Sequence, residues 1–355
     1  MTQNLRVWLA GTGIIIGVGL FIGKLFLGGK TETKVALMSA EEAKGYFGVL
    51  PAIADNPSNP VTPEKLALGK ALFFDPRLSK SAFISCNSCH NLAAGGVDGL
   101  PTSLGHRWQI GRRNAPTVLN AALQAVQFWD GRAADLEEQA GMPILGPGEM
   151  ASSQELVLTR LRSISEYVAK FAAAFPGESE PLTYNNVAKA IAAFERTLLT
   201  PSRFDRFLQG NGSALSRKEQ AGLSRFVSFG CVQCHNGVAI GGGSMQKFGK
   251  MRLPEGLKDN GRFAVTQKEQ DRFVFKVPSL RNIALTAPYF HDGSVWTIEE
   301  ATQIMADVQL GKKLSLKDAA SIATFLKSLN ADPLLEVALP QLPPSTVTTP
   351  RPVVN

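Results

Sequence analysis

The sequence predicts a mainly α-helical protein with two small domains in tandem, behind an N-terminal apolar segment. Strand signals are sparse, whereas apolar residues recur at spacings of three and four in several capped segments. A second observation is that the pentapeptide Cys-Xaa-Xaa-Cys-His occurs twice and uses all four cysteines. A length of 355 residues is enough for one domain around each copy.

The two pentapeptides occupy residues 86–90 and 231–235. Each predicts covalent attachment of a c-type haem, in which both thiols form thioethers and the histidine binds the iron. The alternatives are a zinc site or a disulfide pair, although neither motif has a second cysteine pair nearby to complete four zinc ligands. We therefore expect two cytochrome-c-like haem domains. The predicted haem-binding residues are Cys86, Cys89, His90, Cys231, Cys234 and His235.

Residues 1–30 are expected to form a membrane anchor or a signal segment. Val7 to Gly23 carries no charge, and a shorter apolar run follows Lys24. Such a stretch can cross the roughly 30 Å hydrocarbon core of a bilayer. A cleaved secretory signal is the alternative, but no clear A-x-A-like cleavage site follows the run. Because c-type haem is attached outside the cytoplasm, we expect the globular part on the periplasmic side of the inner membrane, or free in the periplasm after cleavage.

Helix signals divide the rest of the chain. Thr62-Pro63 and the capping box at Ser216 each start a helix that leads into a haem motif. An amphipathic helix over 187–199 is expected to end at Pro201, which marks a domain boundary, and another helix is expected over 315–329. These signals predict haem domains at 45–200 and 201–331, and a proline-rich surface tail at 332–355.

The charge is moderately basic, with 37 Lys and Arg against 30 Asp and Glu. Nucleic-acid binding would require a basic cluster, but the basic residues are scattered along the chain. We predict no nucleic-acid partner. A weakly basic face for an acidic redox partner explains the charge equally well.

The sixth ligand of each iron decides its chemistry. Only two histidines remain outside the motifs, His106 in a Gly- and Arg-rich loop and His291 before an Asp-Gly turn. Residue type alone does not separate Met305 from Met245 or Met251 as a ligand.

From about Leu50 to Leu329 the chain resembles the bacterial dihaem cytochrome c peroxidases. The resemblance lies in both haem motifs and in the phrases Phe-Trp-Asp-Gly-Arg at 128–132, Glu-Met at 149–150, Val-Pro-Ser-Leu-Arg-Asn at 277–282 and Pro-Tyr-Phe-His-Asp-Gly-Ser at 288–294. It implies a low-potential N-terminal haem that reacts with peroxide and a high-potential C-terminal haem that receives electrons. It also implies His106 as the displaceable distal ligand of the first iron and Met305 as a ligand of the second. Thioether ligation raises a haem's potential relative to two histidines, which agrees with this assignment.

The resemblance assigns catalytic roles to three further residues. Trp129 is implied between the two haems, Glu149 over the peroxidatic iron, and Gln139 near the same pocket. A carboxylate in a dry pocket can act as base and then as acid while the O–O bond breaks. Without the resemblance, Trp129 would be interpreted as a half-buried aromatic and Glu149 as an exposed loop glutamate. His291 is not expected to be an axial ligand.

The resemblance also implies a calcium ion between the haem domains. Its expected ligands are the Asn114 side chain and the carbonyls of Thr286 and Pro288, with water completing an oxygen-only site. From the sequence alone, Asn114 would be called a turn residue.

Together these features predict a cytochrome c peroxidase that reduces hydrogen peroxide with electrons from a reduced cytochrome c or cupredoxin. Family members are often homodimers, so a homodimer is also expected. One alternative within the fold is the dihaem enzyme that matures a tryptophan-derived quinone, but that enzyme has a tyrosine ligand where this chain has Met305. The alternative from another class is an electron-transfer dihaem cytochrome with no open iron site.

Overall fold

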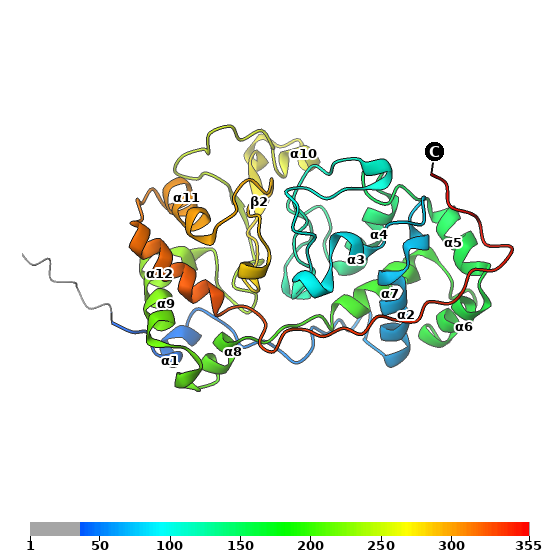
Figure 1. Ribbon diagram of the computed structural model, residues 1–355, viewed down its shortest axis with the longest axis horizontal. Helices are drawn as coiled ribbons and strands as arrows, with labels where there is room; N and C mark the ends of the chain where they lie inside the picture. Colours follow the sequence, from blue (N-terminus) through cyan, green and yellow to red (C-terminus); the bar gives the residue numbers. More distant parts are fainter. Residues whose placement is uncertain (1–35, 355) are drawn as a thin grey trace, which may run out of the picture. The chain divides into compact units, whose positions relative to one another are not determined.

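The computed structural model describes residues 36–354, and most of their regular structure is helical, as predicted (Figure 1). The predicted membrane or signal segment at 1–30 lies outside these residues. Within residues 36–354, no helix has the length and apolarity needed to span a membrane. The α-helices are α1 (Ala40–Lys44), α2 (Pro63–Phe74), α3 (Cys86–Cys89), α4 (Leu136–Leu145), α5 (Gln154–Arg162), α6 (Ser165–Ala174), α7 (Tyr184–Glu195), α8 (Arg203–Leu208), α9 (Arg217–Phe229), α10 (Phe263–Thr266), α11 (Ile298–Leu310) and α12 (Leu316–Lys327).

The remaining regular structure is short. Strands β1 (Met245–Lys247) and β2 (Val274–Lys276) pair antiparallel, with Met245 opposite Lys276. Single 3₁₀ turns connect many of the helices. They span Pro76–Leu78, Leu92–Ala94, His106–Trp108, Ala121–Leu123, Gly212–Ala214, Cys231–Gln233, Glu269–Asp271 and Ile283–Leu285.

One large apolar cluster lies among α2, α4, α5, α6 and α7. Thr62 caps α2 as predicted, because its hydroxyl accepts a hydrogen bond from the Lys65 backbone N–H. α2 crosses α7 so closely that a Cβ on Gly69 would lie 1.8 Å from the Ala190 carbonyl oxygen. Only glycine permits this approach of the two backbones. The crossing supports the helix that leads directly toward the first haem motif.

A second cluster lies among α8, α9, α11 and α12 and also includes Phe47, which follows α1. The predicted capping box is present at the start of α9, where Ser216 and Glu219 exchange hydrogen bonds. α9 crosses α12 at Gly222, where a Cβ would lie 2.2 Å from the Ser321 carbonyl oxygen. The helix leading into each haem motif therefore uses a glycine at its main crossing, which extends the weak duplication seen in the sequence.

Two predicted features differ from the structure. The helix predicted over 187–199 spans Tyr184–Glu195 and ends six residues before Pro201, because the chain turns at Arg196. The Arg196 guanidinium there binds the Glu137 carboxylate at 2.7 Å. The proline therefore follows the helix without ending it.

The described part of the tail, residues 332–354, lies mostly at the surface and also packs against the first half of the chain. Its segment around Leu335, Val337 and Leu342 packs against the first apolar cluster. Further on, the fully buried guanidinium of Arg160 donates to the Pro350 and Arg351 carbonyls, and its other acceptors are carbonyls of residues 77–80. The red segment in Figure 1 runs from the end of α12 to α5. The tail thus contributes to the packing of the first half.

Candidate haem and peroxide site

The two haem motifs form tight turns. The first is α3, and the second is a 3₁₀ turn entered through Gly230 at φ 98°. All four thiols are free, so the disulfide alternative is wrong. Within residues 36–354, no group of three or more Cys, His, Asp and Glu side chains has the arrangement of a metal site.

The second motif lines an apolar cavity that has the donors expected for haem. Cys231, Cys234, His235 and Met305 all line it, and Met305 projects from α11. Nδ1 of His235 is buried without a hydrogen-bond partner. Burial lowers the pKa of His235 to about 4, so the ring is neutral, as an iron ligand requires. These residues fit a haem that is bonded covalently to the two cysteines, with the His235 imidazole and the Met305 sulfur as the two iron ligands.

The first motif has the same type of ligand. Nδ1 of His90 is also buried without a partner, and burial lowers the pKa of this ring. His106 is only 3% exposed, and both of its ring nitrogens lack a partner. A buried imidazole with two orphaned nitrogens is costly unless a ligand engages it. This observation separates His106 from the solvated loop histidine that its sequence context suggests.

The loop that carries His106 is bonded to the loop that carries Glu149. The His106 backbone N–H donates to the Glu149 carbonyl at 2.6 Å, and the Gln109 side chain donates to the Pro147 carbonyl. Gly105 makes this approach possible, because a Cβ there would lie 2.0 Å from the Gly148 oxygen. The structure therefore brings together two residues that the sequence separates by more than forty positions.

Burial raises the pKa of the Cys89 thiol, and the negative charges of Asp98 and Glu149 add to the rise, which indicates that Glu149 lies near the first motif. Glu149 is an exposed residue. Even so, atoms packed around its carboxyl group raise its pKa, and Arg132 opposes the rise. A carboxyl group with a raised pKa is suited to exchanging a proton with substrate. Gln139 is half-buried on α4, and within residues 36–354 no side-chain hydrogen bond joins it to Glu149 or His106.

Trp129 joins the two halves of the chain. Its indole N–H donates to the Asn114 carbonyl at 2.9 Å, and its ring meets His291 edge-on at 6.3 Å. Its own carbonyl accepts from the Lys276 N–H at 2.7 Å. Trp129 also lines the cavity of the second motif. The half-buried ring is therefore held from both sides.

The three predicted calcium ligands lie around one cavity. Asn114, Thr286 and Pro288 all line the cavity that holds the second motif. The Asn114 side-chain NH₂ donates to the Leu100 carbonyl, which leaves its amide oxygen as the group available to a cation.

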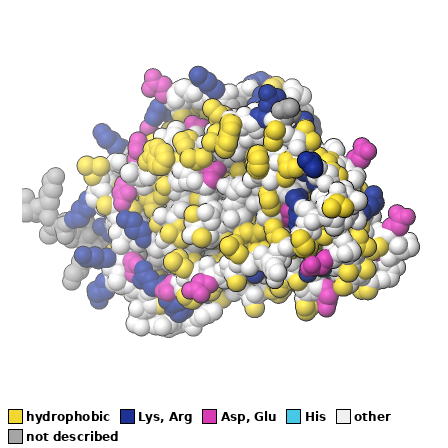
Figure 2. Space-filling model, turned by 45° about the vertical axis from the view of Figure 1, so that its right-hand side comes forward, with side chains coloured by type: hydrophobic (Ala, Val, Ile, Leu, Met, Phe, Trp, Pro, Cys, Tyr) yellow, Lys and Arg dark blue, Asp and Glu magenta, His cyan; other side chains and the backbone are white. Residues whose placement is uncertain are grey.

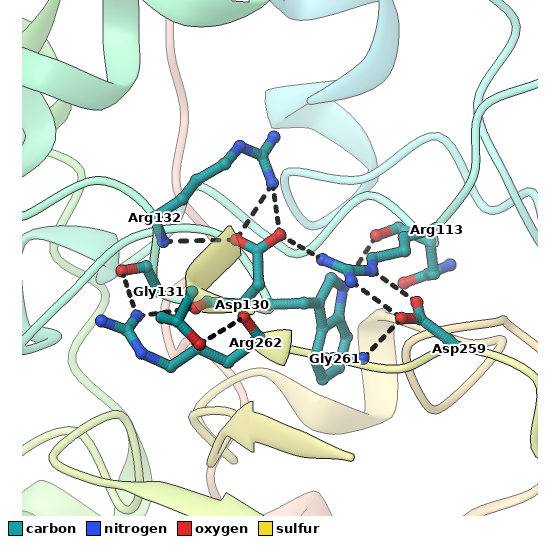
Figure 3. Close-up of polar contacts among 10 residues, drawn as sticks. Arg113, Asp130, Gly131, Arg132, Asp259, Gly261 and Arg262 are labelled. Carbon is teal, nitrogen blue, oxygen red and sulfur yellow. Dashed lines mark hydrogen bonds and ion pairs between the residues drawn. The ribbon is translucent and has the colours of Figure 1, made fainter. Parts of the chain in front are cut away.

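An ion-pair network includes Asp130 and Arg132, which follow Trp129 in the chain (Figure 3). Arg113 binds Asp130 at 2.7 Å and Asp259 at 2.6 Å, and Arg132 binds Asp130 from the other side. Arg262 donates to the carbonyls of residues 130 and 131. Residues 113–132 are thereby fastened to the 259–262 segment. Sequence reasoning missed this network, although the charged residues beside Trp129 in the 128–132 phrase were a visible signal.

Lys276 is a second residue that sequence reasoning missed. It is 4% exposed and lines the cavity of the second motif. Burial lowers its pKa to about 8, and only the charge of Asp130 opposes the shift. It directly precedes the 277–282 phrase, but no local pattern predicts that its ammonium group is buried.

Known proteins share much of this chain. Residues 63–213 match the family model described as di-haem cytochrome c peroxidase. Cytochrome c551 peroxidase of Pseudomonas aeruginosa is 46% identical over 338 residues, covering 93% of this chain and 97% of that protein. The protein of the same name from Nitrosomonas europaea is 48% identical over 330 residues, covering 91% of this chain and 98% of that protein. A crystallised MauG-like protein associated with microbial copper homeostasis is 32% identical, with a TM-score of 0.69 over 81% of this chain and 95% of that one.

Proposed function

Because this chain belongs to the di-haem cytochrome c peroxidase family, we propose that it reduces hydrogen peroxide to water with electrons from a small periplasmic donor such as cytochrome c or a cupredoxin. Two c-type haems attached at the Cys-Xaa-Xaa-Cys-His motifs would supply the redox chemistry, one electron from each. In this proposal, electrons enter at the C-terminal haem and peroxide is reduced at the N-terminal haem. The observation that carries it is the bond that joins the loops of His106 and Glu149 beside the first motif.

His106 is the removable ligand of the first site in this proposal. Two features of its loop support the role. Arg107 and Trp108 both have positive φ, at 58° and 62°, a conformation that non-glycine residues rarely adopt. Trp108 is 81% exposed, so few contacts of its side chain oppose a rearrangement. Withdrawal of His106 would open one coordination position to peroxide.

Glu149 moves the proton in this proposal. Its raised pKa allows the carboxyl group to take a proton from the near oxygen of peroxide and to give it to the leaving oxygen. The positive charge of Arg132 opposes this rise of the Glu149 pKa. Gln139 is assigned a supporting polar role near this site.

Met305 is the permanent ligand of the second site, and Trp129 lies on the route between the sites. The support for Met305 is that it shares a cavity with His235. The support for Trp129 is its pair of bonds, to Asn114 in the first half and to Lys276 in the second. Calcium bound by Asn114, Thr286 and Pro288 would hold the same region, and chelation with EGTA is expected to slow activation.

We assign residues 45–200 to the peroxidatic haem domain, 201–331 to the electron-transfer haem domain and 332–355 to the tail. A homodimer and a periplasmic location are part of the proposal, with residues 1–30 as anchor or cleaved signal. The visible face carries scattered Lys and Arg interleaved with acidic side chains, which suits weak docking of a redox partner and offers no block for nucleic acid (Figure 2).

The test is a titration of the haem-loaded protein to the half-reduced state, followed by peroxide. We expect one haem to become five-coordinate and to react. Glu149→Gln should retain that spectrum and lose about 10²- to 10⁴-fold in turnover with a reduced cytochrome. His106→Gly should change the resting spectrum. Two six-coordinate haems that ignore peroxide at half-reduction would instead identify an electron-transfer cytochrome.

A further inference from the structure

Lys276 presents a buried positive charge to the cavity of the second haem motif. It ends β2 and is 4% exposed. Its ammonium group donates to the side-chain oxygen of Gln124, which is a neutral amide. An amide satisfies one donor but does not neutralise the charge. Burying an ammonium ion without a counter-charge is costly.

The nearby carboxylates are already engaged. Asp130 is the acid whose charge acts on Lys276. Its two oxygens accept hydrogen bonds from Arg113 and Arg132, and Arg113 also binds Asp259 (Figure 3). Asp130 and Asp259 are therefore paired with arginines, and no ion pair to a carboxylate is formed by Lys276 within residues 36–354. Burial consequently lowers the pKa of Lys276 to about 8.

Lys276 lines the same cavity as Cys231 and Cys234, and its ammonium group has a neutral amide, not a carboxylate, as its hydrogen-bond partner. In haem, the vinyl groups that bond to cysteine lie on the opposite edge of the ring from the two propionates. A haem attached at the cysteines would direct its carboxylates away from these thiols, and the buried ammonium group of Lys276 is a cation in the same cavity that could bind one of them.

We propose that Lys276 binds a propionate carboxylate of the haem attached at Cys231 and Cys234 and thereby raises the reduction potential of that haem. The inference rests on the proposed function only in that it requires a haem at the second motif. The ammonium group supplies the propionate with a counter-charge, and the propionate supplies the buried cation with an anion. A positive charge near the ring favours the reduced iron, which carries one positive charge fewer than the oxidised iron.

The consequence bears on the direction of electron flow. The Lys276 backbone N–H is bonded to the Trp129 carbonyl, so the charged side chain is fixed to the segment expected between the sites. Raising the potential of the entry haem makes it the first to be reduced. The half-reduced state on which the proposed activation depends would then be populated by one donor electron.

The experiment is spectroelectrochemical titration of the haem-loaded wild type, Lys276→Met, Lys276→Arg and a control, Lys247→Met. Lys247 lines the same cavity but is exposed to solvent. We expect the potential of the second haem to fall in Lys276→Met, to be restored toward the wild-type value in Lys276→Arg, and to change little in Lys247→Met. Resonance Raman spectra should show the propionate bending mode shifted in Lys276→Met and unshifted in Lys247→Met.

Equal potentials and an unchanged propionate mode in Lys276→Met would overturn the inference. If Lys276→Met does not accumulate, the Lys276→Arg variant tests the inference, because it keeps the charge but moves the donor atoms. A propionate mode in Lys276→Arg identical to that of the wild type would also overturn the inference. Mass spectrometry of the wild type keeps this outcome separate from failure of the proposed function, since a chain without haem at Cys231 and Cys234 would refute the premise itself.

Discussion

Gly146→Ala is expected to impair the proton transfer assigned to Glu149 without touching that residue. A Cβ at position 146 would lie 2.3 Å from Oε2 of Glu149. The carboxyl group must retreat by about 1 Å to restore ordinary contact, and a misplacement of this size can cost about 10²-fold in rate. The carboxyl group is the free end of a flexible side chain, so the clash is relieved by movement of the proton-transferring group.

Folding should not suffer from this change. Gly146 has φ −60° and ψ 117°, which alanine adopts without strain, and the loss of a glycine from the unfolded chain stabilises by about 0.4–1 kcal/mol. Gly148→Ala is a matched control in the same loop, because a Cβ there meets nothing within 4 Å. The two variants therefore differ in one respect, the contact with the Glu149 carboxylate.

The assay is stopped-flow reaction of the half-reduced, haem-loaded enzyme with peroxide, together with thermal melts of both variants. We expect Gly146→Ala to react about 10²-fold more slowly than Gly148→Ala, with a melting temperature no lower than that of the wild type. Equal rates of reaction with peroxide in the two variants would show that proton transfer does not depend on the observed position of the Glu149 carboxylate. A slow Gly146→Ala that also melts early would show general damage instead.

Three further predictions concern stability, each measured by urea denaturation. Arg281→Met leaves the buried Asp205 carboxylate without its bidentate partner and should cost about 3–5 kcal/mol, whereas a loss below 1 kcal/mol would contradict the burial of the pair. Burial raises the pKa of Glu195 to about 8 from 4.5, so the native carboxyl stays protonated while the unfolded one ionises, and stability falls as pH rises between those values. Glu195→Gln should therefore stabilise more at pH 8 than at pH 5, and an equal effect at both would refute a raised pKa. Truncation after Ser345 removes two carbonyl acceptors of Arg160 and should cost about 2 kcal/mol or more; an unchanged midpoint would mean that the tail contacts contribute nothing.

Helix starts could be predicted from the sequence because capping is local. Thr62, Ser216 and Ser315 each accept a hydrogen bond from a backbone N–H three residues further on, so all the required atoms lie within one turn. Helix ends were less predictable. Arg196 directly follows the last residue of α7, and its guanidinium is bonded to Glu137, which is 59 residues earlier in the sequence. No window of a few residues contains this information.

The haem motifs were predictable for the same local reason, since five consecutive residues carry both thiols and the histidine. The charges around them were not. Lys276 and Glu195 lie in segments with no distinctive spacing, and their significance comes from burial, which is a property of the packed chain. Only the fold shows that Lys276 lines the cavity and that a carboxyl oxygen of Glu195 is buried without a hydrogen-bond partner.

The physical difference between the two halves lies in the element that carries each predicted sixth ligand. Met305 is on α11, a 13-residue helix that begins with a capped N-terminus and ends at Gly311 in the left-handed region. His106 is on a loop in which Arg107 and Trp108 both have positive φ, a conformation that costs of order 1–3 kcal/mol per residue. In the proposed function, release of His106 would relax this backbone, whereas release of Met305 would have to disturb a packed helix. Because the His106 N–H is bonded to the Glu149 carbonyl, we expect movement of the His106 loop to shift the loop of the proposed proton carrier as well.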